Sequence, residues 1–133
     1  RVPEDWGRAY EEAVRHVQSR TAPGEPIFVG RPDHSGPFIN DAAFYFLAER
    51  PNPTRYTMMP VGLVADCAAQ EEIVRALEGA QVRVAVLHTE PQAVAGKVAQ
   101  ACLRLDEYLR ANFVLDRRFP LHDALLRAPR KFG

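Results

Sequence analysis

The chain of 133 residues is long enough for one domain whose hydrophobic core is stable without disulfides or bound metals. Its 17 Lys and Arg residues balance its 17 Asp and Glu residues, which argues against a general nucleic-acid binder with a surplus of positive charge. The sequence shows no apolar run of membrane-spanning length and no signal peptide. Because the first residue is Arg1 and not methionine, we expect a fragment of a longer protein.

The N-terminal part is predicted to form a helix, a strand and a second helix. Apolar residues at helical spacing predict an amphipathic helix over about residues 5–20. A Pro-Gly pair predicts a type II turn at 22–25, and the apolar run at 27–30 then forms a buried strand. Asn40 is expected to cap a second helix that begins at Asp41.

The C-terminal part is predicted to form two helices, a central strand and a hairpin. Asp66 can cap a third helix that ends at Gly79. The run at 82–87 is the strongest strand signal, and it is apolar on both faces as in a central parallel strand. We expect a fourth helix over about 89–112 and an antiparallel pair of strands over 113–128 at the sheet edge.

This alternation of strands and helices predicts one α/β domain over residues 1–133. Its expected architecture has three layers: a mainly parallel sheet, helices on both faces and a C-terminal antiparallel hairpin. The outline is Rossmann-like, but the sequence contains neither the G-x-G-x-x-G fingerprint nor a Walker lysine. We therefore expect no nucleotide or other cofactor.

The polar loop at 30–36, directly after the first strand, is the first candidate for a functional site. Ligands of α/β proteins bind beyond the carboxyl ends of strands. Arg31 could hold a phosphate or carboxylate group. Asp33 and His34 could act as base and acid or share a metal. The alternative is a solvated surface loop whose Asp makes a turn hydrogen bond, and the residues alone favour that alternative.

The histidines and cysteines show no ligand spacing, so no metal site is predicted. His16 is expected on the exposed part of the first helix. His88 follows the second strand, so it could lie beside His34 at the same edge of the sheet. Cys67 and Cys102 are expected to be buried free thiols, with a disulfide as the alternative.

Several short motifs, taken together, carry a resemblance to a known family. They are APGEPIFV at 22–29, NDAAFYFLAER at 40–50, PTRY at 53–56, QEEIVRALE at 70–78 and LDEYLRANF at 105–113. This succession resembles the soluble C-terminal domain of bacterial multi-spanning membrane glycosyltransferases. Those enzymes are similar to the dolichyl-phosphate-mannose protein mannosyltransferases and use lipid-linked sugar donors. The similarity spans about residues 10–128.

The resemblance implies an accessory domain on the extracytoplasmic face of the membrane, tethered by membrane helices of the same polypeptide. Its partners would be that transmembrane portion and a lipid-linked sugar or an acceptor, and not nucleic acid. In such enzymes the catalytic acidic residues lie in loops near the first membrane helices. No part of this chain matches those loops, so no catalytic residue is carried over and the domain is expected to be non-catalytic.

The loop position and the resemblance together select the candidate ligand-binding residues. They are Arg31, Asp33, His34, Asn40, Asp41, Tyr45, Arg50 and Arg55. We expect Arg31, Arg50 and Arg55 to line a polar cleft at the carboxyl edge of the sheet and to receive an anionic or sugar ligand. Two alternatives stay open: a free-standing small hydrolase or phosphoryl-transfer enzyme that uses Asp33 and His34, and an interaction module without a ligand.

Overall fold

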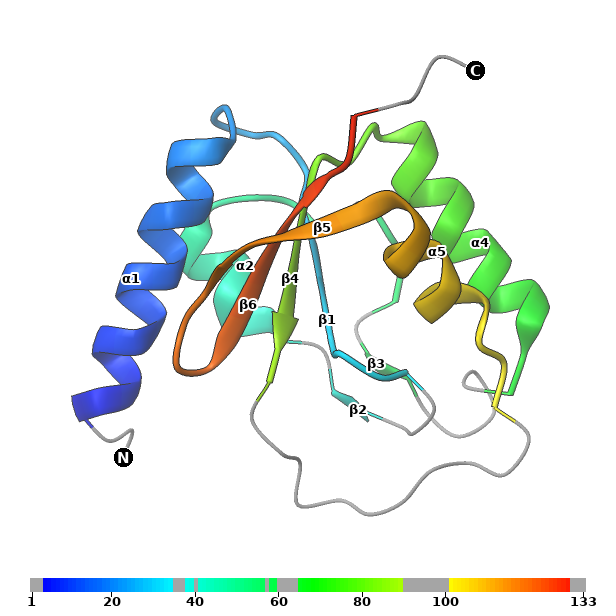
Figure 1. Cartoon of the computed structure of the whole chain (residues 1–133), viewed down its shortest axis with the longest axis horizontal. Coiled ribbons are helices and arrows are strands. Elements are labelled where there is room, and N and C mark those ends of the chain that lie inside the picture. Colours follow the sequence, from blue (N-terminus) through cyan, green and yellow to red (C-terminus); the bar gives the residue numbers. More distant parts are fainter. Residues whose placement is uncertain are drawn as a thin grey trace.

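The computed structural model describes residues 4–34, 38–39, 41–56, 58–59, 65–89 and 101–129, without the side chains of 4–6, 38–39 and 58–59. Within these ranges, a four-stranded sheet has helices on both faces (Figure 1). In spatial order its strands are β1 (Phe28–Gly30), β4 (Val84–His88), β6 (His122–Arg127) and β5 (Phe113–Arg118). A separate ladder pairs β2 (Phe38–Ile39) with β3 (Met58–Met59).

The helices of the described ranges divide into two pairs, one on each face of the sheet (Figure 1). One face carries α1 (Glu4–Arg20) and α2 (Ala42–Ala48), and the other carries α4 (Cys67–Gly79) and α5 (Arg104–Asn112). Helix α1 packs on the sheet because Ala13, Val14 and Val17 recur at helical spacing on its buried side. The predicted first helix and the α/β class with three layers are therefore confirmed.

Each face of the sheet has its own hydrophobic core. Alternate residues of the buried strands point to opposite faces. On the α1–α2 face, Val84 and Val86 of β4 pack with Phe44 of α2. On the α4–α5 face, Ala85 of the same strand packs with Leu105 of α5. Strand β4 therefore lies at the centre of both cores, as its apolar sequence predicts.

The sheet is mixed and not mainly parallel. Among the strands that the structure describes in this sheet, only β1 and β4 form a parallel pair, whereas β4–β6 and β5–β6 are antiparallel. The predicted C-terminal hairpin is confirmed, but its second strand inserts between β4 and β5 and separates them. The short connection between β5 and β6 makes these two strands antiparallel neighbours. The placement of β6 beside β4 then adds a second antiparallel pair. The prediction of a mainly parallel, Rossmann-like sheet is wrong for this reason.

The local signals at turns and helix ends are confirmed with one change. Gly24 has a φ of 79°, and the Glu25 N–H donates to the Ala22 carbonyl at 3.0 Å, as the predicted turn requires. The Asp66 side chain caps α4. The cap of α2, however, is Asp41, whose Oδ1 accepts the Phe44 N–H.

Two predictions fall partly or wholly on residues that the structure does not describe. Asn40, the predicted cap, lies outside the described residues. The same is true of 90–100, the first part of the predicted fourth helix. The part of that helix that is described is α5, which begins at Arg104. No helix in the described ranges is both long and apolar enough to cross a bilayer.

A disulfide joins Cys67, the first residue of α4, to Cys102, which lies two residues before α5. Their Cα atoms are 5.4 Å apart. The two helices pack side by side, and the Gln70 Oε1 accepts the Leu105 N–H at 3.0 Å near the same ends. This packing brings the two sulfur atoms together, so the expectation of free thiols is wrong and the alternative holds.

The disulfide should contribute strongly to stability because it closes a loop of 35 residues. The chain-entropy model gives about 4 kcal/mol for a loop of this length. We expect the double variant Cys67→Ala, Cys102→Ala to lose that much free energy of unfolding in urea titrations. Reduction of the wild-type protein should produce a similar loss. Unchanged stability in both would contradict a structural role.

Gly30 is the second position where stability can be tested, because a Cβ there would lie 2.6 Å from Cε2 of Phe28 and 2.7 Å from Nε2 of His34. We expect Gly30→Ala to lower the free energy of unfolding by about 1–3 kcal/mol through overpacking. The matched control is Gly7→Ala in α1, where nothing lies within 4 Å. Alanine should stabilise that helix by about 0.5–1 kcal/mol. Equal effects in urea titrations would contradict the close packing at Gly30.

Candidate functional site

Two histidines face each other at the edge of the sheet where β1 and β4 end. His88 is the last residue of β4, and His122, the first residue of β6, is its direct partner in the antiparallel register. Directly opposed residues on such a pair extend their side chains to the same face. The two ring centroids are 4.8 Å apart with an interplanar angle of 84°. Strand pairing alone therefore brings the two imidazoles together.

Asp41 reaches these histidines from the N-terminus of α2. Its Oδ2 lies 2.8 Å from His88 Nδ1, 3.0 Å from His122 Nε2 and 2.9 Å from the Tyr10 hydroxyl. We call these four residues the Asp41 cluster. The Asp41 Oδ1 is held by the Phe44 N–H at 3.1 Å. The helix cap thus orients the carboxylate so that one oxygen faces three side-chain partners.

Burial and hydrogen bonding shift the pKa of the Asp41 carboxyl group in opposite directions. Burial raises its pKa, but the hydrogen bonds from His122, His88, Tyr10 and the Phe44 N–H lower it more. The net result is a pKa well below the usual range, so Asp41 is ionised at neutral pH. An ionised carboxylate only accepts hydrogen bonds, so His88 Nδ1 and His122 Nε2 act as donors towards it.

His122 has one polar atom that the cluster leaves unsatisfied. Its side chain is fully buried, and its Nδ1 has no hydrogen-bond partner among the described residues. If neutral His122 donates from Nε2, then Nδ1 carries a buried lone pair. A buried polar atom without a partner costs about 1–3 kcal/mol and calls for an explanation.

The Asp41 cluster contains a set of metal-ligating atoms. One ligand atom each from Asp41, His88 and His122 lies within 4.8 Å of the others. Two imidazoles and one carboxylate are ligands that divalent transition metals accept. The side chains of Asp41 and His88 are 9% and 17% exposed, so the cluster is partly accessible. The arrangement can therefore hold either a hydrogen-bonded charge cluster or a metal ion.

The loop after β1 is anchored on the other face of the sheet. The buried His34 donates from its backbone N–H to both carboxylate oxygens of Asp106, and its Nδ1 lies 2.6 Å from Asp106 Oδ1. The Nε2 of His34 accepts the Arg31 N–H at 3.0 Å. His34 is therefore neutral with its proton on Nδ1, and its carboxylate partner is Asp106 and not Asp33. The idea that His88 lies beside His34 is not supported, because each belongs to a different network.

The three arginines do not line a common cleft. Arg31 follows β1, whereas Arg50 donates to Thr21 Oγ1 at 2.8 Å, beside the residues that precede β1. The Ile27 N–H donates to the Pro51 carbonyl, which places Arg50 at the opposite end of β1 from Arg31. This correction follows from the length of α2, which carries the chain from one end of the strand to the other.

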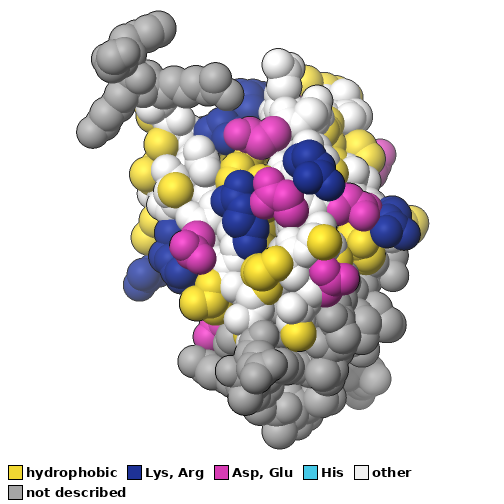
Figure 2. Space-filling model, turned by 90° about the vertical axis from the view of Figure 1, so that its right-hand side faces the viewer, with side chains coloured by type: hydrophobic (Ala, Val, Ile, Leu, Met, Phe, Trp, Pro, Cys, Tyr) yellow, Lys and Arg dark blue, Asp and Glu magenta, His cyan; other side chains and the backbone are white. Residues whose placement is uncertain are grey.

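Arg55 is engaged on the α4–α5 face. Its Nε donates to Glu72 Oε2 of α4 at 2.6 Å, and its guanidinium lies over the Tyr56 ring. The Glu72 carboxylate raises the pKa of Arg55 further above its usual value. Figure 2 shows basic and acidic side chains interspersed on this side of the molecule, in keeping with ion pairs such as Arg104–Glu71. Arg55 thus belongs to a mixed-charge surface.

The remaining sequence candidates have structural contacts or are exposed. The Tyr45 hydroxyl accepts the Val29 N–H at 2.8 Å and so satisfies a donor of β1 at the edge of the sheet. Asp33 is exposed. His16 was expected to be exposed, but its side chain is 9% exposed and lies 2.5 Å from Asp116 of β5. The hairpin folds against α1, which the pattern of that helix alone could not show.

Comparisons of the chain with known proteins found no match. No family model matches it, and neither the curated proteins nor the solved structures contain a match. The resemblance to membrane glycosyltransferases therefore stays a prediction.

Four residues of these networks were not predicted as site residues: Tyr10, His88, His122 and Asp106. One signal was available for His88, because Val84, Val86 and His88 alternate and must share a face of the sheet. His122 could be placed opposite it only once the register between β4 and β6 was known.

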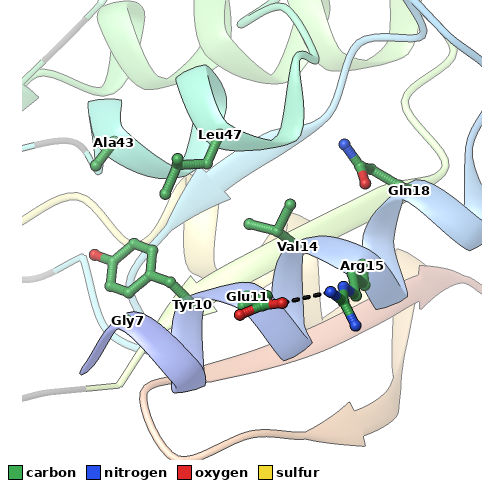
Figure 3. Close-up of a pocket in the computed structure, with 8 residues that line it drawn as sticks. All are labelled: Gly7, Tyr10, Glu11, Val14, Arg15, Gln18, Ala43 and Leu47. Atoms are coloured by element: carbon green, nitrogen blue, oxygen red, sulfur yellow. Dashed lines mark hydrogen bonds and ion pairs between the residues drawn. The ribbon is translucent and has the colours of Figure 1, made fainter. Parts of the chain in front are cut away.

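Tyr10 also connects the cluster to an apolar pocket between α1 and α2. The pocket has a volume of about 630 Å³. Its lining residues are Gly7, Tyr10, Glu11, Val14, Arg15, Gln18, Ala43 and Leu47 (Figure 3). The ion pair between Arg15 and Glu11 lies along α1 beside this pocket (Figure 3). A single tyrosine thus contributes its ring to the pocket and its hydroxyl to Asp41.

The depressed pKa of Asp41 predicts how stability depends on pH. Because the pKa is lower in the folded state than in the unfolded state, the contribution of Asp41 is complete above the unfolded value of about 3.9. It is lost as the pH falls through the folded value. The variant Asp41→Asn keeps a capping oxygen but removes the charge, and should be less stable by more than about 2 kcal/mol at neutral pH.

Urea titrations of both proteins at several pH values provide the measurement. The stability difference between wild type and Asp41→Asn should shrink by about 1 kcal/mol between pH of about 5 and about 3. Asp66→Asn, at the exposed cap of α4, is the matched control, and its stability should differ much less from that of the wild type. A difference that is independent of pH would contradict the ionised state of Asp41.

Proposed function

We propose that this chain is an extracytoplasmic accessory domain of a membrane glycosyltransferase that uses a lipid-linked sugar donor. In this proposal, membrane helices of the same polypeptide tether the domain, and it supplies no catalytic group for sugar transfer. The observation that carries the proposal is the disulfide between Cys67 and Cys102. Disulfides persist in oxidising compartments and are rare in the reducing cytosol. The disulfide supports the extracytoplasmic placement that the sequence motifs imply.

The state of His34 supports a non-catalytic role over the alternative of a small free-standing enzyme. A general base must reach the proton of its substrate within hydrogen-bond distance. His34 is buried, and its two ring nitrogens contact the Asp106 carboxylate and the Arg31 N–H. These contacts position the loop after β1 and do not present His34 to a substrate. Hydrolysis or phosphoryl transfer by Asp33 and His34 therefore gains no support.

We assign the contact with the lipid-linked donor or the acceptor to the edge where β1 and β4 end. Ligands of α/β sheets bind outside the carboxyl ends of the strands. Arg31 and Asp41, both selected from the sequence, lie beyond the end of β1 and beside the end of β4. Arg50 and Arg55 lie elsewhere and are not part of this proposal.

Thiol labelling of the natural protein in intact cells tests the placement. After treatment with a reductant that does not cross the membrane, a membrane-impermeant maleimide should label Cys67 and Cys102 without cell lysis. The variant Cys67→Ala, Cys102→Ala is the control and should remain unlabelled at these positions. Labelling that needs lysis but no reductant would place the chain in the cytosol and overturn the proposal.

Assays of sugar transfer from a polyprenyl-phosphate sugar test the accessory role. The membrane-embedded full-length protein should transfer sugar, and removal of residues 1–133 should weaken that activity. The isolated domain should transfer none. Transfer by the isolated domain, or a gene that encodes no membrane helices with it, would contradict the proposal.

A further inference from the structure

We propose that Asp41, His88 and His122 form a binding site for a divalent transition metal ion, with Zn²⁺ as the best fit. The site shares Asp41 with the edge proposed to contact the donor or acceptor, but the inference rests on the geometry of the Asp41 cluster and not on the role in sugar transfer. It would provide three protein ligands and leave one coordination position for water or a ligand oxygen, as zinc sites with three protein ligands do.

The backbone holds the three ligands in place before any metal arrives. His88 and His122 are register partners on the adjacent strands β4 and β6, and each of these strands pairs with a further strand on its other side. Asp41 is fixed by the cap hydrogen bond between its Oδ1 and the Phe44 N–H. Little conformational freedom remains to be lost on binding, which favours a preformed site over one that folds around the ion.

The distances require only small side-chain adjustments. Ligand atoms around tetrahedral Zn²⁺ are separated by about 3.3 Å, given Zn–N and Zn–O bonds of about 2.0–2.1 Å. Asp41 Oδ2 now lies 2.8 Å from His88 Nδ1 and 3.0 Å from His122 Nε2, so these contacts must open slightly. All three ligand atoms lie within 4.8 Å of one another, so the two imidazole nitrogens need to approach each other by at most about 1.5 Å.

The protonation changes on binding also favour a metal. The proton of each neutral imidazole would move from the nitrogen that faces Asp41 to the other ring nitrogen, and the ion would bind through the nitrogen so freed. For His122 the single ring proton would then sit on Nδ1, the buried atom that has no hydrogen-bond partner among the described residues. The rings of Tyr10 and Phe44, both with centroids 4.8 Å from that of His122, border this imidazole. An N–H can make weak contacts with aromatic faces, whereas a lone pair gains nothing from them.

The surroundings supply outer support and indicate which metal fits. Tyr10 and the Phe44 N–H both donate to the Asp41 carboxylate, as outer-shell groups in metal sites do. Two nitrogen ligands and one oxygen favour zinc, cobalt or nickel over magnesium and calcium, which prefer oxygen ligands. Cys67 and Cys102 are joined in a disulfide, so neither offers a competing thiolate.

Calorimetric titration of the tag-free, oxidised and metal-stripped chain with Zn²⁺ alone tests the proposal. Near neutral pH we expect one equivalent to bind with a micromolar or lower Kd. Mg²⁺ should not bind measurably. The absence of stoichiometric Zn²⁺ binding to the wild-type protein would overturn the proposal.

Matched histidine variants assign the site. His88→Gln removes a partly exposed ligand and should weaken Zn²⁺ binding by at least about 100-fold, since even outer-shell changes cost about 10–100-fold. His16→Gln is the control, because it removes a different His–Asp contact, that with Asp116. Its Kd should remain within about twofold of wild type. Loss of binding in His16→Gln with retention in His88→Gln would refute the assignment.

A measurement on the wild-type protein covers the case in which His88→Gln does not fold. In NMR spectra of the histidine rings, Zn²⁺ should shift the resonances of His88 and His122. Those of His34 and His16, which contact Asp106 and Asp116, should stay in place. Shifts confined to His16 or His34 would overturn the proposal.

Discussion

The hydrogen bonds to the carboxylate of Asp41 hold together one whole edge of the domain. It connects α1 through Tyr10, α2 through the cap, β4 through His88 and β6 through His122. Burying an ionised group is costly unless hydrogen bonds satisfy it. Here four donors do so, and their combined effect keeps the carboxyl group ionised. Segments that are far apart in the sequence are thus connected through the one charged side chain of Asp41.

A second buried pair, His34 and Asp106, works on the opposite face with a different result. There both ring nitrogens and the backbone N–H of the histidine are used to hold the loop after β1 against α5. In the Asp41 cluster, two imidazoles and a hydroxyl converge on a single oxygen. The first arrangement holds the backbone of the loop in place, whereas the second brings three potential metal-ligand atoms close together. This contrast explains why the site is assigned to Asp41 and not to His34.

The two faces of the sheet carry different features. The α4–α5 face carries the disulfide and surface ion pairs such as Arg55–Glu72. The α1–α2 face carries the Asp41 cluster and the apolar pocket that shares Tyr10 with it. The accessory domain that we propose would be tethered outside the cytoplasm and would need a scaffold that folds without its parent. The disulfide and the two separate cores meet that requirement.

Local features of the chain were readable from the sequence by itself. The periodicity of α1, the Asp66 cap, the turn at Gly24 and the hairpin each depend on residues within a few positions of one another. Such signals act through nearby backbone atoms, so they do not need the rest of the fold.

Only the tertiary structure decided which distant residues meet. The pairing of β4 with β6 put His88 opposite His122, and the packing of α4 on α5 joined Cys67 to Cys102. The same hairpin insertion made the sheet mixed and buried His16. These outcomes follow from register and packing between segments many residues apart, and a shift of one residue in a strand turns every side chain to the other face. No local pattern contains that information.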